Sequence, residues 1–220
     1  MAITIGNTSS AGHNLSITPR NLSHTINSGT NRLLVVGISE RNKQTPQTMT
    51  YNGVAMTKLI EQASQIATSS MTLWYMLEAS LPAGGAYNIT YSNNEDRAWG
   101  EWFAICLSNV KQEVPFVFDG ANTGNGQTNR SVTLNGLLNG DAILFMSTNN
   151  NTTTWTPAAD YTEVFDATNG GDNFGSSTLI RRIVVDAGNY TPNSTASASG
   201  FVTSAALAVR PSFLPQIIQM

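Results

Sequence analysis

The sequence predicts an all-β, jelly-roll-like antiparallel β-sandwich built from two related halves, with N- and C-terminal arms. Three observations lead to this fold class. Short apolar stretches alternate with a period of two residues and are separated by Gly- and Asn-containing turns. No stretch shows a sustained 3.6-residue apolar period with helix caps. The second half of the chain also repeats the layout of the first.

Turn signals delimit the predicted strands. Asn52-Gly53, Asp119-Gly120 and Asn139-Gly140 are dipeptides that favour tight turns. The best helix candidate, residues 58–65, is too short and leads into a Ser/Thr stretch. We therefore expect strands near 2–5, 14–18, 22–26, 32–39, 47–51, 54–60, 70–78, 86–92, 97–108, 114–118, 129–134, 141–148, 160–166, 176–185 and 199–210.

In two of these strands the residues on each face can be assigned from the two-residue alternation. Along 70–78 the odd-numbered side chains are apolar, and the even-numbered face carries Trp74. Along 97–108 both faces are largely apolar, so this strand is expected to be covered on both sides, as a central strand or a subunit contact would be. Cys106, the single cysteine, lies in this strand and should behave as a small buried hydrophobic residue.

The repeat sets the domain organisation. Residues 32–39 return as 141–148, and residues 70–77 return as 176–183. The join near 110–119 is strand-like rather than a flexible linker, which favours one sandwich of two related halves over two separate domains. We expect an N-terminal arm or edge strands over 1–28, a sandwich over 29–211 with halves at about 30–110 and 129–211, and a C-terminal tail over 212–220.

Composition argues against several partner classes. The net charge is −3, and charged residues make up only 11% of the chain, against about 25% in typical domains. Arg181-Arg182 is the only adjacent basic pair, so phosphate-mediated nucleic-acid binding has little support. No apolar run approaches the length of a membrane span, and the N-terminus has no signal-peptide pattern. We expect no membrane partner. The chain is either a mature or truncated form of a secreted protein or, as its Met-Ala start favours, a protein made in the cytoplasm that reaches the outside inside a particle.

The chemistry-bearing residues do not form a recognisable site. His13 and His24 lack neighbouring ligands or an orienting carboxylate. Glu95-Asp96 and Glu101 are the best candidates for a glycosidase pair, although Glu95-Asp96 is typical of a hairpin tip. The oxygen-rich segment 166–173 lacks the spacing of a calcium loop. We assign no catalytic residue, cofactor or metal.

Aromatic and apolar side chains are the remaining candidates for contacts. Tryptophans serve either as core residues or as anchors for subunits and sugar rings. The tail carries two prolines among apolar residues and should dock on its own domain or on a neighbour. The candidate contact residues are Trp155, in a Thr-rich loop, together with Trp74, Arg181, Arg182, Phe213, Leu214, Ile217 and Ile218.

Several strings resemble a β-rich module of phage virion proteins and bacterial surface proteins. These are residues 50–59 (TYNGVAMTKL), 71–77 (MTLWYML), 81–84 (LPAG) and 87–90 (YNIT), with the Ala-rich closing strand and Arg-Pro at 205–211 (AALAVRP). The resemblance covers roughly 30–211. Arg181-Arg182 departs from it, standing in place of an aromatic pair, and the two terminal arms lie outside the module.

The resemblance implies a jelly-roll-like sandwich with a non-enzymatic role in a virion or at a surface. The favoured function is a phage capsid decoration or cement subunit that binds the major capsid protein or other virion proteins. It would assemble as a homo-oligomer, with a trimer among the symmetric forms considered. The alternative is a carbohydrate-binding or adhesin module of a tail fibre or bacterial surface protein, with glycans as partners. A glycan-cleaving enzyme is the third hypothesis.

Overall fold

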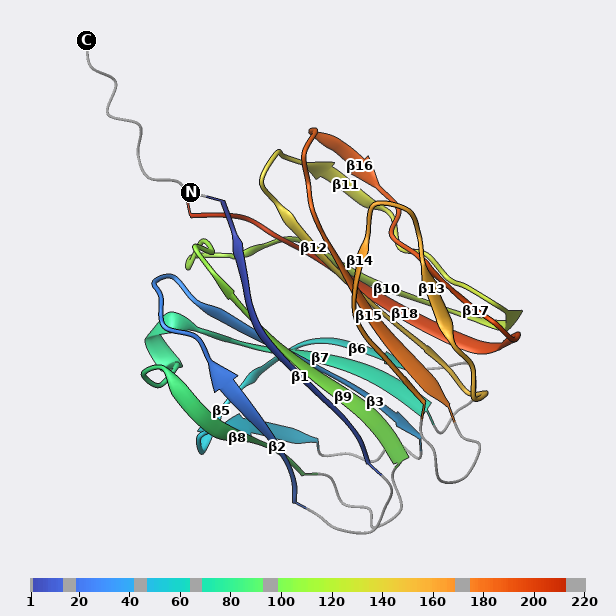
Figure 1. Ribbon diagram of the computed structural model, residues 1–220, viewed down its shortest axis with the longest axis horizontal. Helices are drawn as coiled ribbons and strands as arrows, with labels where there is room; N and C mark the ends of the chain where they lie inside the picture. The colour runs from blue at the N-terminus through green and yellow to red at the C-terminus, as the bar shows by residue number, and fades with distance from the viewer. Residues whose placement is uncertain are drawn as a thin grey trace.

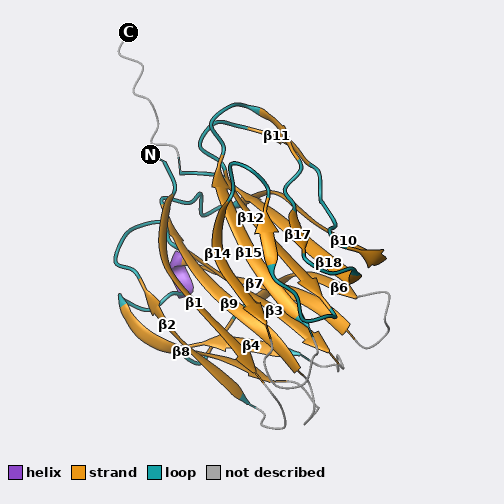
Figure 2. Cartoon of the chain, turned by 45° about the vertical axis from the view of Figure 1, so that its right-hand side comes forward, coloured by secondary structure: helices purple, strands orange, loops and turns teal. Residues whose placement is uncertain are grey.

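The computed structural model describes residues 2–13, 19–41, 47–63, 69–92, 99–168 and 175–212. Their regular structure is almost entirely β-strand (Figures 1 and 2). The single helical element in these ranges is one 3₁₀ turn, η1 (Glu78–Ser80). Every strand pairing is antiparallel. The predicted all-β antiparallel sandwich is therefore confirmed.

The first half of the chain builds two sheets that enclose a core. The large sheet contains, in spatial order, β1 (Thr4–His13), β9 (Trp99–Ser108), β3 (Leu33–Arg41), β7 (Ser69–Leu77) and β6 (Thr57–Ala63). The outer sheet contains β2 (Arg20–Ile26), β8 (Gly85–Ser92), β4 (Thr48–Tyr51) and β5 (Val54–Ala55). The chain passes back and forth between the two sheets, which is the connectivity of a jelly roll.

The second half places its strands in the same chain order. Its large sheet contains β10 (Phe116–Gln127), β18 (Gly200–Val209), β12 (Ala142–Asn149), β15 (Ser176–Ile183) and β14 (Thr162–Thr168). Its outer layer is smaller and divided into two pairs: β11 (Leu134–Leu137) with β16 (Gly188–Tyr190), and β13 (Trp155–Pro157) with β17 (Ser194–Ala196).

The two large sheets pack against each other, so the molecule has four layers rather than the two expected from the sequence. β1 lies against β14, β6 against β10, β9 against β15 and β7 against β18. The shared core draws on both halves; its buried residues include Leu33, Val35, Leu73, Phe103, Ile105, Leu107, Leu144, Met146, Leu179 and Leu207. The extra layers arise because each half keeps an outer sheet of its own.

The opposite face of each large sheet packs on its own outer layer. In the first half Trp74, Met76 and Cys106 meet Tyr51 and Ile89 of the outer sheet. In the second half a corresponding core joins the large sheet to β11 and its surroundings. β9 is thus buried on both faces and lies between β1 and β3, which confirms the expectation that residues near 97–108 are covered on both sides.

The N-terminal segment is integrated into the fold. β1 is an edge strand of the large sheet and β2 is an edge strand of the outer sheet. The Ser9 hydroxyl lies 3.0 Å from His24 Nδ1, which links the two strands across the side of the sandwich. The sequence left open whether residues 1–28 form an arm or edge strands; the described part forms edge strands.

The described ends of the chain meet at one pole of the molecule. Val110, just after β9, bridges to Pro211, just after β18. The Asn109 side-chain amide donates to the Ala2 carbonyl over 3.1 Å, and the Ser212 amide donates to the Asn109 carbonyl over 2.7 Å. We call this end, where Ala2 and Ser212 lie close to Asn109, the terminal pole (Figure 1).

The burial of β9 leads to a prediction about Cys106. Its side chain is fully buried, and burial raises the pKa of the thiol. A thiol-specific reagent at neutral pH is expected to leave the folded protein unmodified and to react fully after unfolding in urea. Rapid labelling of the folded protein would contradict the position given to β9.

Candidate functional site

Two of the sequence-predicted contact residues lie in the cores. The structure corrects the expectation that Trp155 is on the surface: its side chain is 5% exposed, and its indole N–H donates to the Ser176 hydroxyl over 3.0 Å. Trp74 is equally buried and donates to the Thr72 hydroxyl over 3.1 Å. Each ring fills space between a large sheet and its outer layer, so neither face is free for a sugar or a partner.

Arg181 and Arg182 lie on opposite faces of β15, as expected for neighbours on a strand. The Arg182 guanidinium lies over the rings of Tyr161 and Tyr190, 5.5 and 5.0 Å from their centroids. It also lies 3.5 Å from the Asp160 carboxylate. The contact with Tyr190 joins β15 to β16 of the smaller outer layer, so Arg182 has a structural role within the chain.

The strand register also corrects the comparison between the two halves. Tyr75 pairs with Val35 in the first half, and Arg181 pairs with Leu144 in the second. Arg181 therefore takes the place of Tyr75, and Arg182 takes the place of Met76. Trp74 corresponds to Ile180, another core residue. The two arginines therefore stand in place of Tyr75 and Met76, and not in place of the aromatic pair Trp74-Tyr75.

The remaining predicted contact residues, Phe213, Leu214, Ile217 and Ile218, lie outside the described residues. The point where this segment begins is well defined. The Ser212 amide bonds to Asn109, and the Asn31 side-chain amide donates to the Ser212 hydroxyl over 3.4 Å. The segment 213–220 therefore starts at the terminal pole.

Three exposed apolar side chains lie on separate loops at the terminal pole. Four large hydrophobic residues are exposed in the described ranges, and three of them are Val114, Leu138 and Val185, at 75%, 43% and 58%. The fourth, Val54, lies on β5 in the outer sheet of the first half. We call Val114, Leu138 and Val185 the terminal patch.

The loop that carries each residue of the terminal patch is linked to Arg210 or Pro211, directly or through a neighbouring loop. Val114 precedes Pro115, whose carbonyl accepts the Arg210 amide over 2.9 Å. The Leu138 amide donates to the same Asp141 carboxylate that pairs with Arg210. Val185 follows Val184, whose carbonyl accepts the amide of Gly140, and the Cα of Gly140 faces the Pro211 ring.

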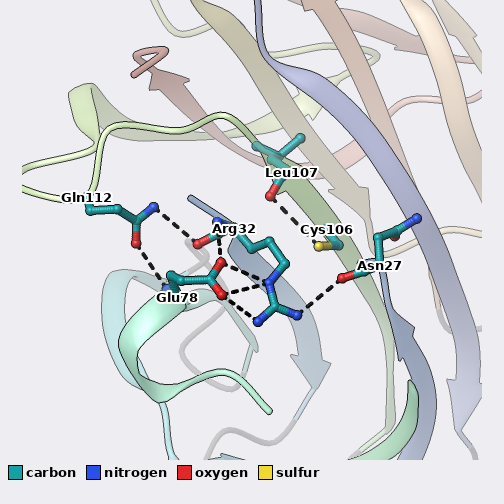
Figure 3. A network of polar contacts seen from close by, with 6 residues as sticks. All are labelled: Asn27, Arg32, Glu78, Cys106, Leu107 and Gln112. Carbon is teal, nitrogen blue, oxygen red and sulfur yellow. Dashed lines mark hydrogen bonds and ion pairs between the residues drawn. The ribbon is translucent and has the colours of Figure 1, made fainter. Parts of the chain in front are cut away.

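Two ion pairs hold this pole. Arg210 donates to both oxygens of the fully buried Asp141 over 3.1 and 3.0 Å, and this pairing raises the pKa of Arg210. Arg32 and Glu78 form the second pair, at 2.6 Å, in which hydrogen bonds from Arg32 lower the pKa of the Glu78 carboxyl (Figure 3). Paired charges of this kind fix geometry because separating them would leave a charge poorly solvated.

The second ion pair reaches the segment that joins the halves. Gln112 accepts a hydrogen bond from the Glu78 amide over 3.0 Å, and its own amide donates to the Arg32 carbonyl (Figure 3). The same side-chain amide also donates to the Val110 carbonyl over 3.0 Å. Arg32 also donates to the Asn27 carbonyl over 3.2 Å. Val114, two residues beyond Gln112, is thus presented by an anchored loop, with a left-handed φ of 71° that is rare for a β-branched residue.

The residues considered for catalysis or metal binding are dispersed. Glu101 is 3% exposed on the face of β9 that packs on the second half, whereas Glu40 lies on the other face of the same sheet, with Tyr91 and Gln47. Asp166 accepts the Trp155 amide. Glu95 and Asp96 lie outside the described residues. Among the described residues no three His, Cys, Asp or Glu side chains converge on a metal position.

No family model, curated protein or solved structure matches the chain. In the described part of the chain, no helix is long and apolar enough to cross a membrane.

The Arg32–Glu78 pair yields a test of how the terminal pole is held. Replacing Glu78 by Ala leaves the Arg32 guanidinium, whose side chain is 7% exposed, without its main partner. We expect Glu78→Ala to lower the free energy of unfolding by about 2 kcal/mol in urea titrations. Asp160→Ala is the control: it removes an exposed partner of Arg182 and should cost less than about 0.5 kcal/mol. An equal loss of unfolding free energy in the two variants would contradict the role given to the Arg32–Glu78 pair.

His24 yields a pH-dependence prediction. Its ring is 1% exposed, and burial lowers its pKa from 6.5 to about 4. The unfolded chain takes up the proton near pH 6.5 and the folded protein only near pH 4, so acidification between these values favours unfolding. The free energy of unfolding should therefore fall by up to about 3 kcal/mol through this group: the full value is present above pH 6.5, and it is lost as the pH falls to 4. His24→Asn, compared by urea titration at pH 7 and pH 4.5, should show a flatter pH dependence; an identical loss in both proteins would show that other groups cause it.

Proposed function

We propose that this protein is a structural component of a phage-type virion, a capsid decoration or cement subunit, attached to the particle through its terminal pole. The observation that carries the proposal is the terminal patch. Three of the four exposed large apolar side chains in the described residues lie on loops at the pole where Ser212 is held. Grouped exposed apolar side chains mark contact surfaces on soluble proteins.

The scaffold behind the patch supports this role. The shared core joins both halves, and the two ion pairs fix the loops that present the patch. A rigid attachment surface loses little conformational entropy on binding. Of the described carboxylates considered for catalysis or metal binding, Glu101 is buried between the two large sheets and Asp166 accepts the Trp155 amide, which favours a binding protein over an enzyme.

The strength of the patch favours several copies acting together. Burying a Val or Leu side chain contributes about 1.5–3 kcal/mol when it starts fully exposed, and these three start partly exposed. One patch therefore gives roughly 3–5 kcal/mol, which is near the lower bound of the cost of association, about 4 kcal/mol. The tail and a homo-oligomer, for which a trimer is one symmetric form, would supply the rest through multivalency.

Attachment is tested by co-sedimentation with particles of the encoding virus that lack this protein. Removing residues 213–220 and, separately, replacing Val114 by Asp should each reduce occupancy at least about tenfold, since each loss exceeds about 1.4 kcal/mol. Val54→Asp, an exposed valine away from the terminal pole, is the matched control and should bind like the unchanged protein. Unchanged occupancy of both the shortened protein and Val114→Asp would refute attachment through this pole.

A further inference from the structure

The two halves of the chain are joined by a two-residue hinge. On one side, Gln112 is fixed to the first half by the side-chain hydrogen bonds described above. On the other side, Pro115 is buried and its carbonyl accepts the Arg210 amide of the second half over 2.9 Å. Between these two anchors lie Glu113 and Val114, which are both exposed. We call Glu113 and Val114 the hinge.

The hinge carries backbone strain at Val114. Its φ of 71° lies in the left-handed region, which a β-branched side chain disfavours. Val114 also precedes Pro115, and the proline ring further restricts the backbone of the residue before it. A strained residue persists only where the surrounding structure holds it, and here the anchors on both sides do so. Opening the hinge would release this strain.

The halves are separate units on either side of the hinge. Within the described ranges each sheet takes its strands from one half only, and the single bridge between the halves pairs Val110 with Pro211. Each large sheet also has a core beneath its own outer layer. An open chain would lose only the shared core, whose apolar faces are unfavourable in water. The corresponding half of a second copy has the residues that restore this core.

We propose that this protein exchanges halves with a second copy of itself and so forms a domain-swapped dimer. The first half of each chain packs on the second half of the other, and the shared core forms twice. The contacts between the halves are kept, so the release of strain at Val114 in both chains favours the dimer against the cost of association. A short hinge under strain promotes this kind of exchange. The inference concerns the free protein and is independent of the attachment proposed above.

Refolding tests the exchange, because chains that start unfolded can pair within one copy or between two. The protein is diluted from urea at two final concentrations about a hundredfold apart, and the dimer fraction is measured by size exclusion with light scattering. Dimer should form in the concentrated sample and be nearly absent from the dilute one. Val114→Gly accepts a left-handed φ and should lower the dimer fraction at least about tenfold. Val114→Thr keeps the β-branch and the strain, so it should dimerise like the unchanged protein.

An engineered disulfide reports which chains share a core. Val110 and Pro211 are bridge partners on different halves, and such partners have a Cα separation that a disulfide accepts. In the double variant Val110→Cys/Pro211→Cys, the two thiols meet within one chain in the monomer and between chains in an exchanged dimer. The variant is refolded with reductant, separated by size and then oxidised. The dimer fraction should remain dimeric on a denaturing gel without reductant, and the monomer fraction should run as a monomer.

Each other outcome overturns the proposal. A concentrated sample that stays monomeric shows that no exchange occurs, and a dimer that Val114→Gly leaves unchanged is not driven by strain at the hinge. Loss of the dimer in Val114→Thr assigns it to apolar contact between terminal patches. A dimer whose disulfides all lie within single chains is held by surface contact rather than by exchange. The experiment contains no particle, so these results leave the proposed attachment to its own test.

Discussion

The shared apolar core between the two five-stranded sheets is the constraint on which the rest of the structure depends. Each large sheet has an apolar face that its own outer layer does not cover, such as the face of β9 that carries Phe103 and Ile105. Leaving such a face in water is unfavourable, so the two halves must pack together. The ring centroids of Phe103 and Phe165, which come from different halves, lie 5.6 Å apart. Those of Tyr75 and Phe116 lie 5.0 Å apart. This packing leaves the two outer layers to face solvent.

The shared core also brings the described ends of the chain, Ala2 and Ser212, together. Because β9 and β18 end at the same pole, Val110 and Pro211 are close enough to bridge. The ion pairs Arg32–Glu78 and Arg210–Asp141 then hold the loops at that pole. A surface assembled this way contains residues from distant parts of the chain, and the proposed attachment pole is a consequence of how the halves pack.

The differences between the halves have a packing explanation. In the first half β8 is continuous and covers Met76. In the second half the corresponding region is divided between β16 and β17. Arg182, at the position of Met76, lies between two tyrosine rings where that cover is reduced. Arg182, one of the two arginines that the sequence marked as candidate contacts, therefore compensates in part for a smaller outer sheet.

The sequence alone determined the fold class, because the two-residue alternation of apolar side chains is a local property of extended chain. It also identified β9 as buried on both faces, since both of its residue sets are apolar. The sequence did not determine which side chains are exposed at positions where the surrounding residue types suggest the opposite of the observed burial. Trp155 occurs in a Thr-rich loop yet is buried against Val202, whereas Val114 occurs in a strand-like join yet is 75% exposed. Only the tertiary structure decided these positions and the grouping of the terminal patch, because burial depends on which distant strands pack over a residue, and that is fixed by the meeting of the two halves.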